Sequence, residues 1–183
     1  MRNTANHTKY THVLQVLYME THLNNCIFCD IISNKAPSEK IYEDDYVTCI
    51  KDINPASTHH YLILPNKHIN NAKELCSTDD ELYDRILSTV DIIAEQQDLT
   101  VTRTGFHWPP FNTISHLHLH VISPICNINF FKKFIFKPNS YWFVSVRIMH
   151  TLKIINPLFQ IDLKLMNIVL QTDYVKSYLK NRK

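Results

Sequence analysis

Three histidines alternate with apolar residues in one short stretch of the chain, at His116, His118 and His120. In a β-strand, successive side chains point to opposite faces, so the three imidazoles would share one face with about 6.6 Å between neighbours. Leu117 and Leu119 would then turn toward the core. Neutral imidazole can attack an electrophile, carry a proton or bind a metal ion. The spacing therefore predicts a chemical site on one face of a strand.

Two other interpretations of these histidines stay open from the sequence alone. A half-exposed strand can use histidine as an ordinary polar residue, which is the commoner explanation for a single histidine. Alternatively, all three imidazoles could bind one metal ion, since histidine is a frequent zinc ligand. Three histidines at a period of two favour chemistry over the first interpretation, because such a row neither packs like aliphatic residues nor carries a reliable charge.

The surrounding sequence predicts the elements that position the histidines. A short amphipathic helix begins near Cys26, because its apolar residues recur at helical spacing, and it ends before Pro37. Strand-like runs follow at 47–50, 60–64, 101–106 and 115–122. Prolines and short polar residues between these runs indicate turns.

A long helix is predicted from about residue 78 to residue 97. Thr78 and Glu81 have the spacing of a capping box. One apolar stripe along the helix consists of Leu82, Ile86, Val90 and Ile93. Because such a stripe should pack on a sheet, we expect an α+β fold with an antiparallel sheet of about five strands, one long helix and a short N-terminal helix.

The chain of 183 residues is long enough for one packed domain with tails. Residues 1–25 are polar and lack a sustained period, so we expect a flexible N-terminal tail. The domain itself is predicted to span 26–150, with the aromatic run 130–146 packed on it. A C-terminal extension, 151–183, shows no clear domain pattern, and its structure is left unassigned.

Composition excludes several classes of function. A formal net charge of +2 is too small to indicate a dedicated nucleic-acid binder or a membrane-surface protein. Gly105 is the only glycine, so neither of the glycine-rich phosphate-binding motifs can be written in this sequence. Any phosphate must therefore be held by side chains and ordinary backbone amides.

Cysteine content and hydropathy predict a compartment. Five cysteines form an odd set, and the apolar run 13–19 is short and lacks a cleavage site, so we expect no signal peptide and a reducing environment. No segment reaches the roughly 18 apolar residues that a membrane span needs. These features predict a cytoplasmic protein with access to the nucleus.

Longer motifs make the chain resemble the histidine-triad (HIT) proteins, whose motif is His-φ-His-φ-His-φ-φ with φ apolar. The resemblance covers about residues 26–150 and includes CIFCDII, YEDDYVTCIKDINP, HHYLILPNKHI and GFHWPPFNTISHLHLHVI. Within the family, GFHWPPFN and NSYWF at 139–143 are most similar to the third branch of histidine triad nucleotide-binding proteins, the adenosine 5'-monophosphoramidase group. The third histidine separates this chain from the nucleotidylyltransferase branch, which carries glutamine there.

The resemblance implies a role for each site residue. His118 would be the nucleophile, His120 would donate hydrogen bonds to the phosphate, and His60 matches another phosphate-site position. The nucleotide-binding positions would be Asp52 and Ile53 at the ribose and base, Ile27, Phe28, Ile31 and Ile50 around the base, and His107, Asn112 and Thr113 near the phosphate and leaving group. His107 departs from the asparagine of better-known relatives, and the loop that follows is shorter.

Cys26 and Cys29 supply two thiols at a spacing typical of zinc sites, and a structural zinc needs four ligands. The resemblance supplies the other two as His68 and His116. Such a closed Cys2His2 shell would be structural, and the chemistry itself would need no cofactor. The alternative is two reduced cysteines near the edge of the core.

The resemblance implies hydrolysis of adenosine 5'-phosphoramidates, such as AMP linked to an amine or to lysine, through a covalent nucleotidyl-histidine intermediate. A second hypothesis is cleavage of dinucleoside polyphosphates or acyl-adenylates. A third, from another class, is a nucleotide-binding scaffold, for which the aromatic residues around Trp142 would serve protein partners. The family also implies a homodimer or higher homo-oligomer.

Overall fold

A computed structural model describes residues 26–146 and 149, and the chain divides into two compact units, residues 1–37 and 38–183. The described part of the first unit is helix α2, Ile27–Ile32. The helix is capped at Ser33, whose amide donates to Cys29 O at 3.0 Å. Asn34 follows in the left-handed region, with φ of 60°. The predicted short helix is therefore confirmed. The predicted tail and C-terminal extension lie outside the described residues.

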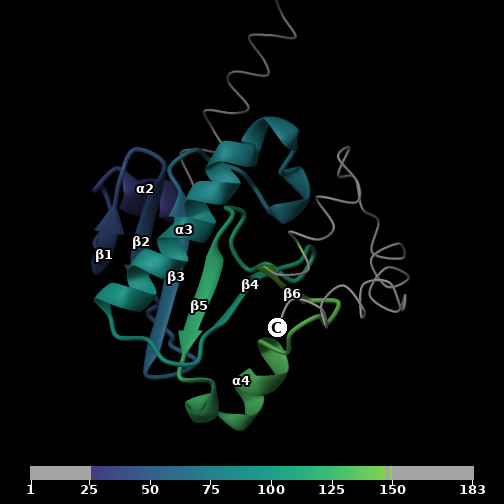
Figure 1. Cartoon of the computed structure of the whole chain (residues 1–183). Helices are drawn as coiled ribbons and strands as arrows, with labels where there is room; N and C mark the ends of the chain where they lie inside the picture. Colours follow the sequence, from purple (N-terminus) through teal and green to yellow (C-terminus); the bar gives the residue numbers. More distant parts are fainter. Residues whose placement is uncertain (1–25, 147–148, 150–183) are drawn as a thin grey trace, which may run out of the picture. The chain divides into compact units, whose positions relative to one another are not determined.

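The second unit is built on a six-stranded antiparallel sheet with the order β1-β2-β3-β5-β4-β6 (Figure 1). The strands are β1 Lys40–Glu43, β2 Val47–Lys51, β3 His59–Pro65, β4 Arg103–His107, β5 Leu119–Ser123 and β6 Phe143–Ser145. The described α-helices of this unit include α3, Asp80–Gln96, and α4, Phe130–Ile135. The prediction of an α+β fold with an antiparallel sheet is confirmed. The sheet has six strands rather than about five, and β1 and β6 lie outside the strand-like runs predicted from the sequence. In the described part of the chain, no helix is long and apolar enough to cross a membrane.

Helix α3 covers one face of the sheet and packs on β3 (Figure 1). The predicted apolar stripe is confirmed, since Leu82, Ile86 and Ile93 are buried and Val90 is partly buried. They join side chains that alternate along the strands, such as Ile63 of β3, in one core. This alternation leaves the other side chains of the same strands for the opposite face.

The predicted start of the long helix is wrong in detail. A 3-10 turn, η2, spans Ser77–Asp79, and α3 begins only after it. Cys76 and Asp79 form the reciprocal capping contacts of that turn, with the Cys76 amide donating to Asp79 Oδ2 at 3.2 Å. Lys67 Nζ also donates to the Asp79 carboxylate at 2.8 Å. The cap therefore forms at Asp79, which accepts hydrogen bonds from the Cys76 amide and from Lys67, and not at Thr78 as the capping-box pattern predicted.

The predicted strand 115–122 is also wrong at its beginning, because β5 starts at Leu119. Pairing with β3 runs only as far as Ile63 opposite Leu119, close to the end of β3 at Pro65. A proline has no backbone N–H to extend the ladder. Instead, the imidazole of His116 donates to Pro65 O at 3.0 Å, and Leu117 N donates to Ile69 O at 2.6 Å. The first two triad histidines therefore precede the strand.

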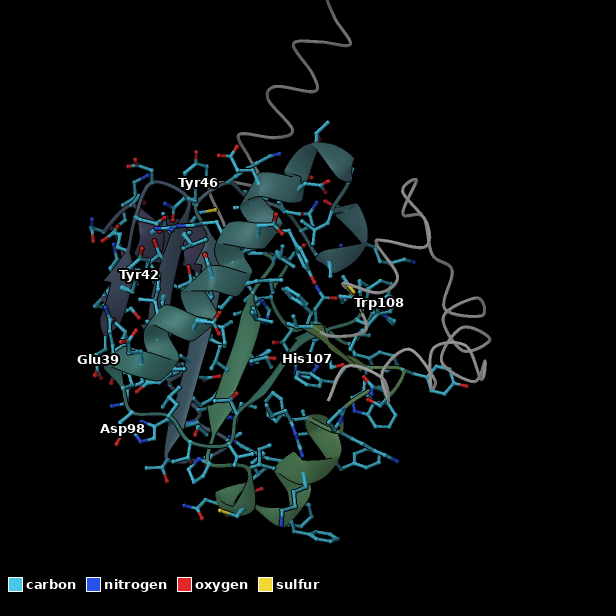
Figure 2. The ribbon with its side chains drawn as sticks, in the orientation of Figure 1. Glu39, Tyr42, Tyr46, Asp98, His107 and Trp108 are labelled. Carbon is cyan, nitrogen blue, oxygen red and sulfur yellow. The ribbon has the colours of Figure 1, made fainter. Side chains whose placement is uncertain are left out.

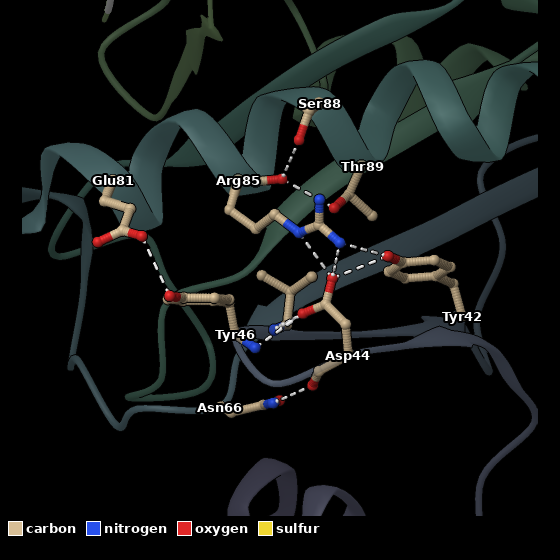
Figure 3. A network of polar contacts seen from close by, with 9 residues as sticks. Tyr42, Asp44, Tyr46, Asn66, Glu81, Arg85, Ser88 and Thr89 are labelled. Carbon is tan, nitrogen blue, oxygen red and sulfur yellow. Dashed lines mark hydrogen bonds and ion pairs between the residues drawn. The ribbon is translucent and has the colours of Figure 1, made fainter.

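A polar network joins the turn between β1 and β2 to α3 (Figure 3). The carboxylate of Asp44 accepts hydrogen bonds from Tyr46 N at 2.7 Å, Val47 N at 2.9 Å, Tyr42 Oη at 2.8 Å and Arg85 Nε at 2.7 Å. Burial by itself would raise the pKa of Asp44, but these hydrogen bonds hold it below its usual value. The ionised carboxylate therefore fixes the turn and ties it to the helix.

We expect Asp44→Ala to lower the free energy of unfolding by about 2 kcal/mol, because several donors lose a charged acceptor. Asp45→Ala, at the exposed neighbouring position, should change it little. A carboxylate with a lowered pKa stabilises the fold above its unfolded pKa, and that contribution is lost as the pH falls through the folded pKa. Urea unfolding should therefore show the difference at pH 7 and a shrinking difference below about pH 4. Equal loss in both variants would contradict this role.

Candidate active site

Two histidines meet across neighbouring strands on the sheet face opposite α3. Leu62 of β3 pairs with His120 of β5, and His60 comes two residues earlier on the same face of β3. Both side chains are buried, and His60 Nε2 lies 2.9 Å from His120 Nδ1. The strand register thus brings together two histidines that are 60 positions apart in the sequence.

A hydrogen-bond chain sets the protons on these two rings. The backbone amide of Ala56 donates to His60 Nδ1 at 3.0 Å, so Nδ1 holds a lone pair and the ring proton is on Nε2. That proton is donated to His120 Nδ1, which places the proton of neutral His120 on its own Nε2. Nε2 of His120 is buried without a hydrogen-bond partner among the described residues. His120 therefore presents a buried N–H donor.

His118 has the opposite tautomer. Its Nδ1 lies 2.6 Å from His116 O, and a carbonyl can only accept, so Nδ1 carries the proton and Nε2 holds the lone pair. Burial lowers the pKa of His118, and the bond to His116 O opposes that effect. The rings of His118 and His120 are 4.9 Å apart. A neutral imidazole with an Nε2 lone pair thus lies beside an N–H donor.

Asp52 approaches the same group from the loop after β2. Its Oδ2 is 3.2 Å from His60 Nδ1. A carboxylate oxygen of Asp52 and one ring nitrogen each of His60 and His120 lie within 4.8 Å of one another. An ion pair would need a proton on Nδ1, whereas the Ala56 amide needs a lone pair there. Burial lowers the pKa of His60 to about 4 although Asp52 acts against it, so the neutral ring is favoured at pH 7. We therefore assign the lone pair to Nδ1.

Hydrogen bonds hold the loop that carries Asp52 in place. Asp52 Oδ1 accepts from Asn54 N at 2.7 Å, which forms a tight turn. Lys132 of α4 donates to Asn54 O at 2.5 Å and to Pro55 O at 3.0 Å. Nothing in the sequence pattern indicated Lys132, because its partners lie more than 75 positions away.

Aromatic side chains enclose the histidines. The rings of His107 and Phe136 lie 4.9 Å and 5.1 Å from the ring of His120. Phe143 packs against both of them, at 5.2 Å from His107 and 5.5 Å from Phe136. Gly105 makes room for this packing, because a Cβ there would lie 2.7 Å from the Phe143 ring. The single glycine of the chain therefore allows the wall beside His120 to form.

The remaining residues expected to bind nucleotide are placed as follows. Phe28 and Ile31 are buried on α2 in the first unit, and Ile27 on the same helix is 46% exposed. In the second unit, Ile50 is buried on β2, whose register places it beside Leu62 and hence on the face of His120. Ile53 is 99% exposed; Asn112 donates to Ile114 O, and Thr113 is exposed on the loop before the triad. His107, which is labelled in Figure 2, also belongs to this set. Its ring lies 4.9 Å from that of His120.

The expected zinc ligands fall in both units. In the first unit, Cys26 is buried at the start of α2 and Cys29 is partly buried on it. In the second unit, the rings of His68 and His116 are 4.9 Å apart, edge to face. His116 Nε2 donates to Pro65 O, and His68 Nε2 lies 3.2 Å from the side-chain oxygen of Asn70. Both rings therefore carry their protons on Nε2, as is common for zinc-binding histidines.

Comparison with known proteins agrees with this geometry. A family model described as "Scavenger mRNA decapping enzyme C-term binding" matches residues 25–135. A solved HIT family hydrolase from Clostridium thermocellum superposes with a TM-score of 0.53 at 35% identity, over 55% of this chain and 91% of that one. The chain belongs to the histidine-triad family. The expectation drawn from the triad motif is thereby confirmed.

Two named relatives each match about two thirds of this chain. Adenosine 5'-monophosphoramidase HINT3 of Mus musculus is 39% identical over 128 residues, which are 67% of this chain and 78% of the relative. The protein of the same name from Xenopus tropicalis is 42% identical over 126 residues, or 66% and 82% of the two chains. These histidine-triad proteins are named for cleavage of a phosphoramidate of adenosine.

We expect His60 to remain neutral at about pH 5.5, because burial lowers its pKa from 6.5 to about 4. Below the unfolded pKa, the unfolded chain takes up a proton that folded His60 does not. The free energy of unfolding should therefore be unaffected by this group above about pH 6.5 and should fall as the pH decreases from about 6.5 toward 4. NMR titration of its ring C–H signals measures the protonation directly.

The same protein in concentrated urea provides the control, since its exposed histidines should titrate near 6.5. Titration of His60 near 6.5 in the folded protein would contradict the assigned proton chain.

Proposed function

We propose that this histidine-triad protein hydrolyses adenosine 5'-phosphoramidates to AMP and an amine through a covalent nucleotidyl-histidine intermediate. The observation that carries the proposal is the pair of opposite tautomers, with the Nε2 lone pair on His118 and the buried Nε2–H on His120. A nucleophile and a donor for a phosphate oxygen are thus 4.9 Å apart, ring to ring. The names of the similar proteins support the same substrate class.

In the first step, Nε2 of His118 attacks the α-phosphorus while the P–N bond to the leaving amine breaks. Its Nδ1–H bond to His116 O stabilises the positive charge that grows on the ring. The amine leaves with the bonding electron pair and takes up one proton. Because burial lowers the pKa of His118, the neutral form that attacks phosphorus persists at pH values below the ordinary pKa of histidine.

In the second step, water attacks the same phosphorus and the Nε2–P bond breaks. The water oxygen stays on AMP, and the released hydrogen replaces the proton that the amine consumed. Nε2 of His120 donates to a phosphate oxygen in both steps, where negative charge accumulates at the transition state. His60 keeps this donor in place, because its own Nε2–H occupies His120 Nδ1.

Asp52 is proposed to accept hydrogen bonds from the ribose hydroxyls, which are uncharged donors. Its loop is held by the Lys132 contacts, so the carboxylate is presented from a fixed position. Ile50, together with Ile27, Phe28 and Ile31, is proposed to contact the base. The cytoplasmic and nuclear location and the homodimer belong to the same proposal and remain predictions.

We expect His118→Ala to lower kcat/KM for a fluorogenic AMP–amine conjugate by about a thousandfold or more, because the nucleophile is removed. His118→Asn provides a second variant of similar polarity in case the alanine variant is unstable. His59→Ala is the matched control, since this neighbouring histidine contacts Tyr61 rather than the triad. Wild-type turnover by either His118 variant would overturn the proposal.

The same assay separates the alternatives. If dinucleoside polyphosphates or acyl-adenylates give the higher kcat/KM, the leaving group is an oxygen rather than an amine. If the protein binds AMP tightly but turns over no adenylate above background, it is a nucleotide-binding scaffold.

We also propose that Cys26, Cys29, His68 and His116 hold a structural zinc ion. The supporting features are the CxxC pair at α2 and the two histidines whose Nε2 protons are used by oxygen acceptors. Two thiolates and two imidazoles suit tetrahedral zinc and leave no ligand position for substrate. The metal would stabilise the fold at the base of the triad, and the chain's own histidines would carry out the chemistry.

Elemental analysis of protein purified without added metal should give about one zinc per chain. Cys29→Ser should lose most of this zinc, because a four-ligand shell loses one thiolate. Cys126→Ser, at an exposed cysteine, should keep it. Well under one zinc per chain in the unmodified protein would refute the site.

A further inference from the structure

A pocket of about 380 Å³ lies next to the histidines, and nothing described so far uses it. It is lined by His107, Phe111, Phe134, Ile135 and Trp142. No side chain with a formal charge lines it apart from the imidazole, and burial lowers the pKa of that imidazole. Its size is within the range of small-molecule sites, and its lining suits a flat apolar group.

Three of its apolar side chains are unusually exposed for their size. Phe111 is 49% exposed, Phe134 is 64% exposed and Ile135 is 44% exposed. Packing of the domain does not account for such exposure, because apolar surface is ordinarily removed from water. Grouped apolar surface around a hollow more often marks a site of binding.

The walls of this pocket are fixed by hydrogen bonds. Trp142 Nε1 donates to Phe134 O at 3.0 Å, which joins the indole to α4. The carbonyl of Trp142 accepts from His107 Nδ1 at 3.0 Å and from Trp108 N at 2.9 Å, which joins it to the end of β4. The Phe134 and Trp142 rings are 4.7 Å apart. The pocket is therefore preformed, and an entering group would not have to order it.

His107 connects the pocket to the proposed active site. It lines the pocket on one side, and its ring lies 4.9 Å from that of His120 on the other. A single side chain thus separates His120 from the pocket. His107 therefore lies between the pocket and the phosphate donor His120.

We propose that this aromatic pocket binds the leaving group of the substrate, and that the preferred leaving group is an arylalkyl amine rather than a charged one such as lysine. This inference rests on the proposed phosphoramidase function and names the class of its substrate. The ring of the amine would stack among Phe111, Phe134 and Trp142 while its nitrogen stays bonded to phosphorus. An uncharged lining stabilises an aryl group and offers no partner to a carboxylate or ammonium group.

The test compares two AMP phosphoramidates, of 2-phenylethylamine and of ethylamine, which present the same kind of primary alkyl nitrogen to phosphorus and differ in the ring. We expect kcat/KM to be higher for the phenylethylamine conjugate by about tenfold or more, from burial of the ring. Phe134→Ala should lower kcat/KM for the phenylethylamine conjugate by more than it lowers kcat/KM for the ethylamine conjugate, and so remove most of this preference. Phe131→Ala, an exposed phenylalanine of the same helix outside this pocket, should keep it.

The outcomes distinguish the two proposals. Turnover of both conjugates with equal kcat/KM, or equal loss on both in Phe134→Ala, would overturn the pocket assignment and leave the phosphoramidase function standing. Turnover of neither would overturn the function and, with it, this inference. Sedimentation of the same variants tests whether a second copy of the chain fills the pocket instead. If Phe134→Ala changes the oligomeric state and keeps the aryl preference, the pocket belongs to an interface between copies and the pocket assignment is wrong.

Discussion

The hydrogen bond between His60 Nε2 and His120 Nδ1 is the interaction on which the rest of the site depends. It spans two strands, and the amide of Ala56 at its far end decides which ring nitrogen carries each proton. Reversing that chain would leave a lone pair on His120 Nε2 where a phosphate oxygen needs a donor. A backbone amide in a loop therefore sets the chemistry of a histidine on the strand opposite.

The fold supplies two further constraints. Because β3 ends at Pro65, the residues just before β5 do not pair with it. His116 instead donates from its imidazole to Pro65 O, and its own carbonyl accepts a hydrogen bond from His118 Nδ1. Gly105 of β4 leaves room for the ring of Phe143 to pack directly over it, and this ring supports the aromatic wall beside His120. Because these positions act through backbone geometry, each histidine of the triad receives a different partner.

Local pattern predicted much of this structure. The helix near Cys26, the stripe of α3 and four of the strands follow from apolar periodicity, which local sequence encodes. The triad was expected to lie on one strand, and this was wrong for His116 and His118, because pairing with β3 stops near the end of β3, which is a property of the partner strand. Strands β1 and β6 and helix α4 were missed. The four residues of β1 include no buried side chain that would give a strand pattern. The pairing of β6 with β4 and the contacts of α4 with the loop at Asn54 depend on residues distant in sequence.

The proton positions on His118 and His120 are the part of this account that connects structure to chemistry most closely. Nitrogen-15 NMR of the ring nitrogens at neutral pH measures them directly, before any substrate is chosen. We predict a protonated Nδ1 and an unprotonated Nε2 on His118, with the opposite arrangement on His120. An unprotonated Nδ1 on His118, or an unprotonated Nε2 on His120, would contradict it.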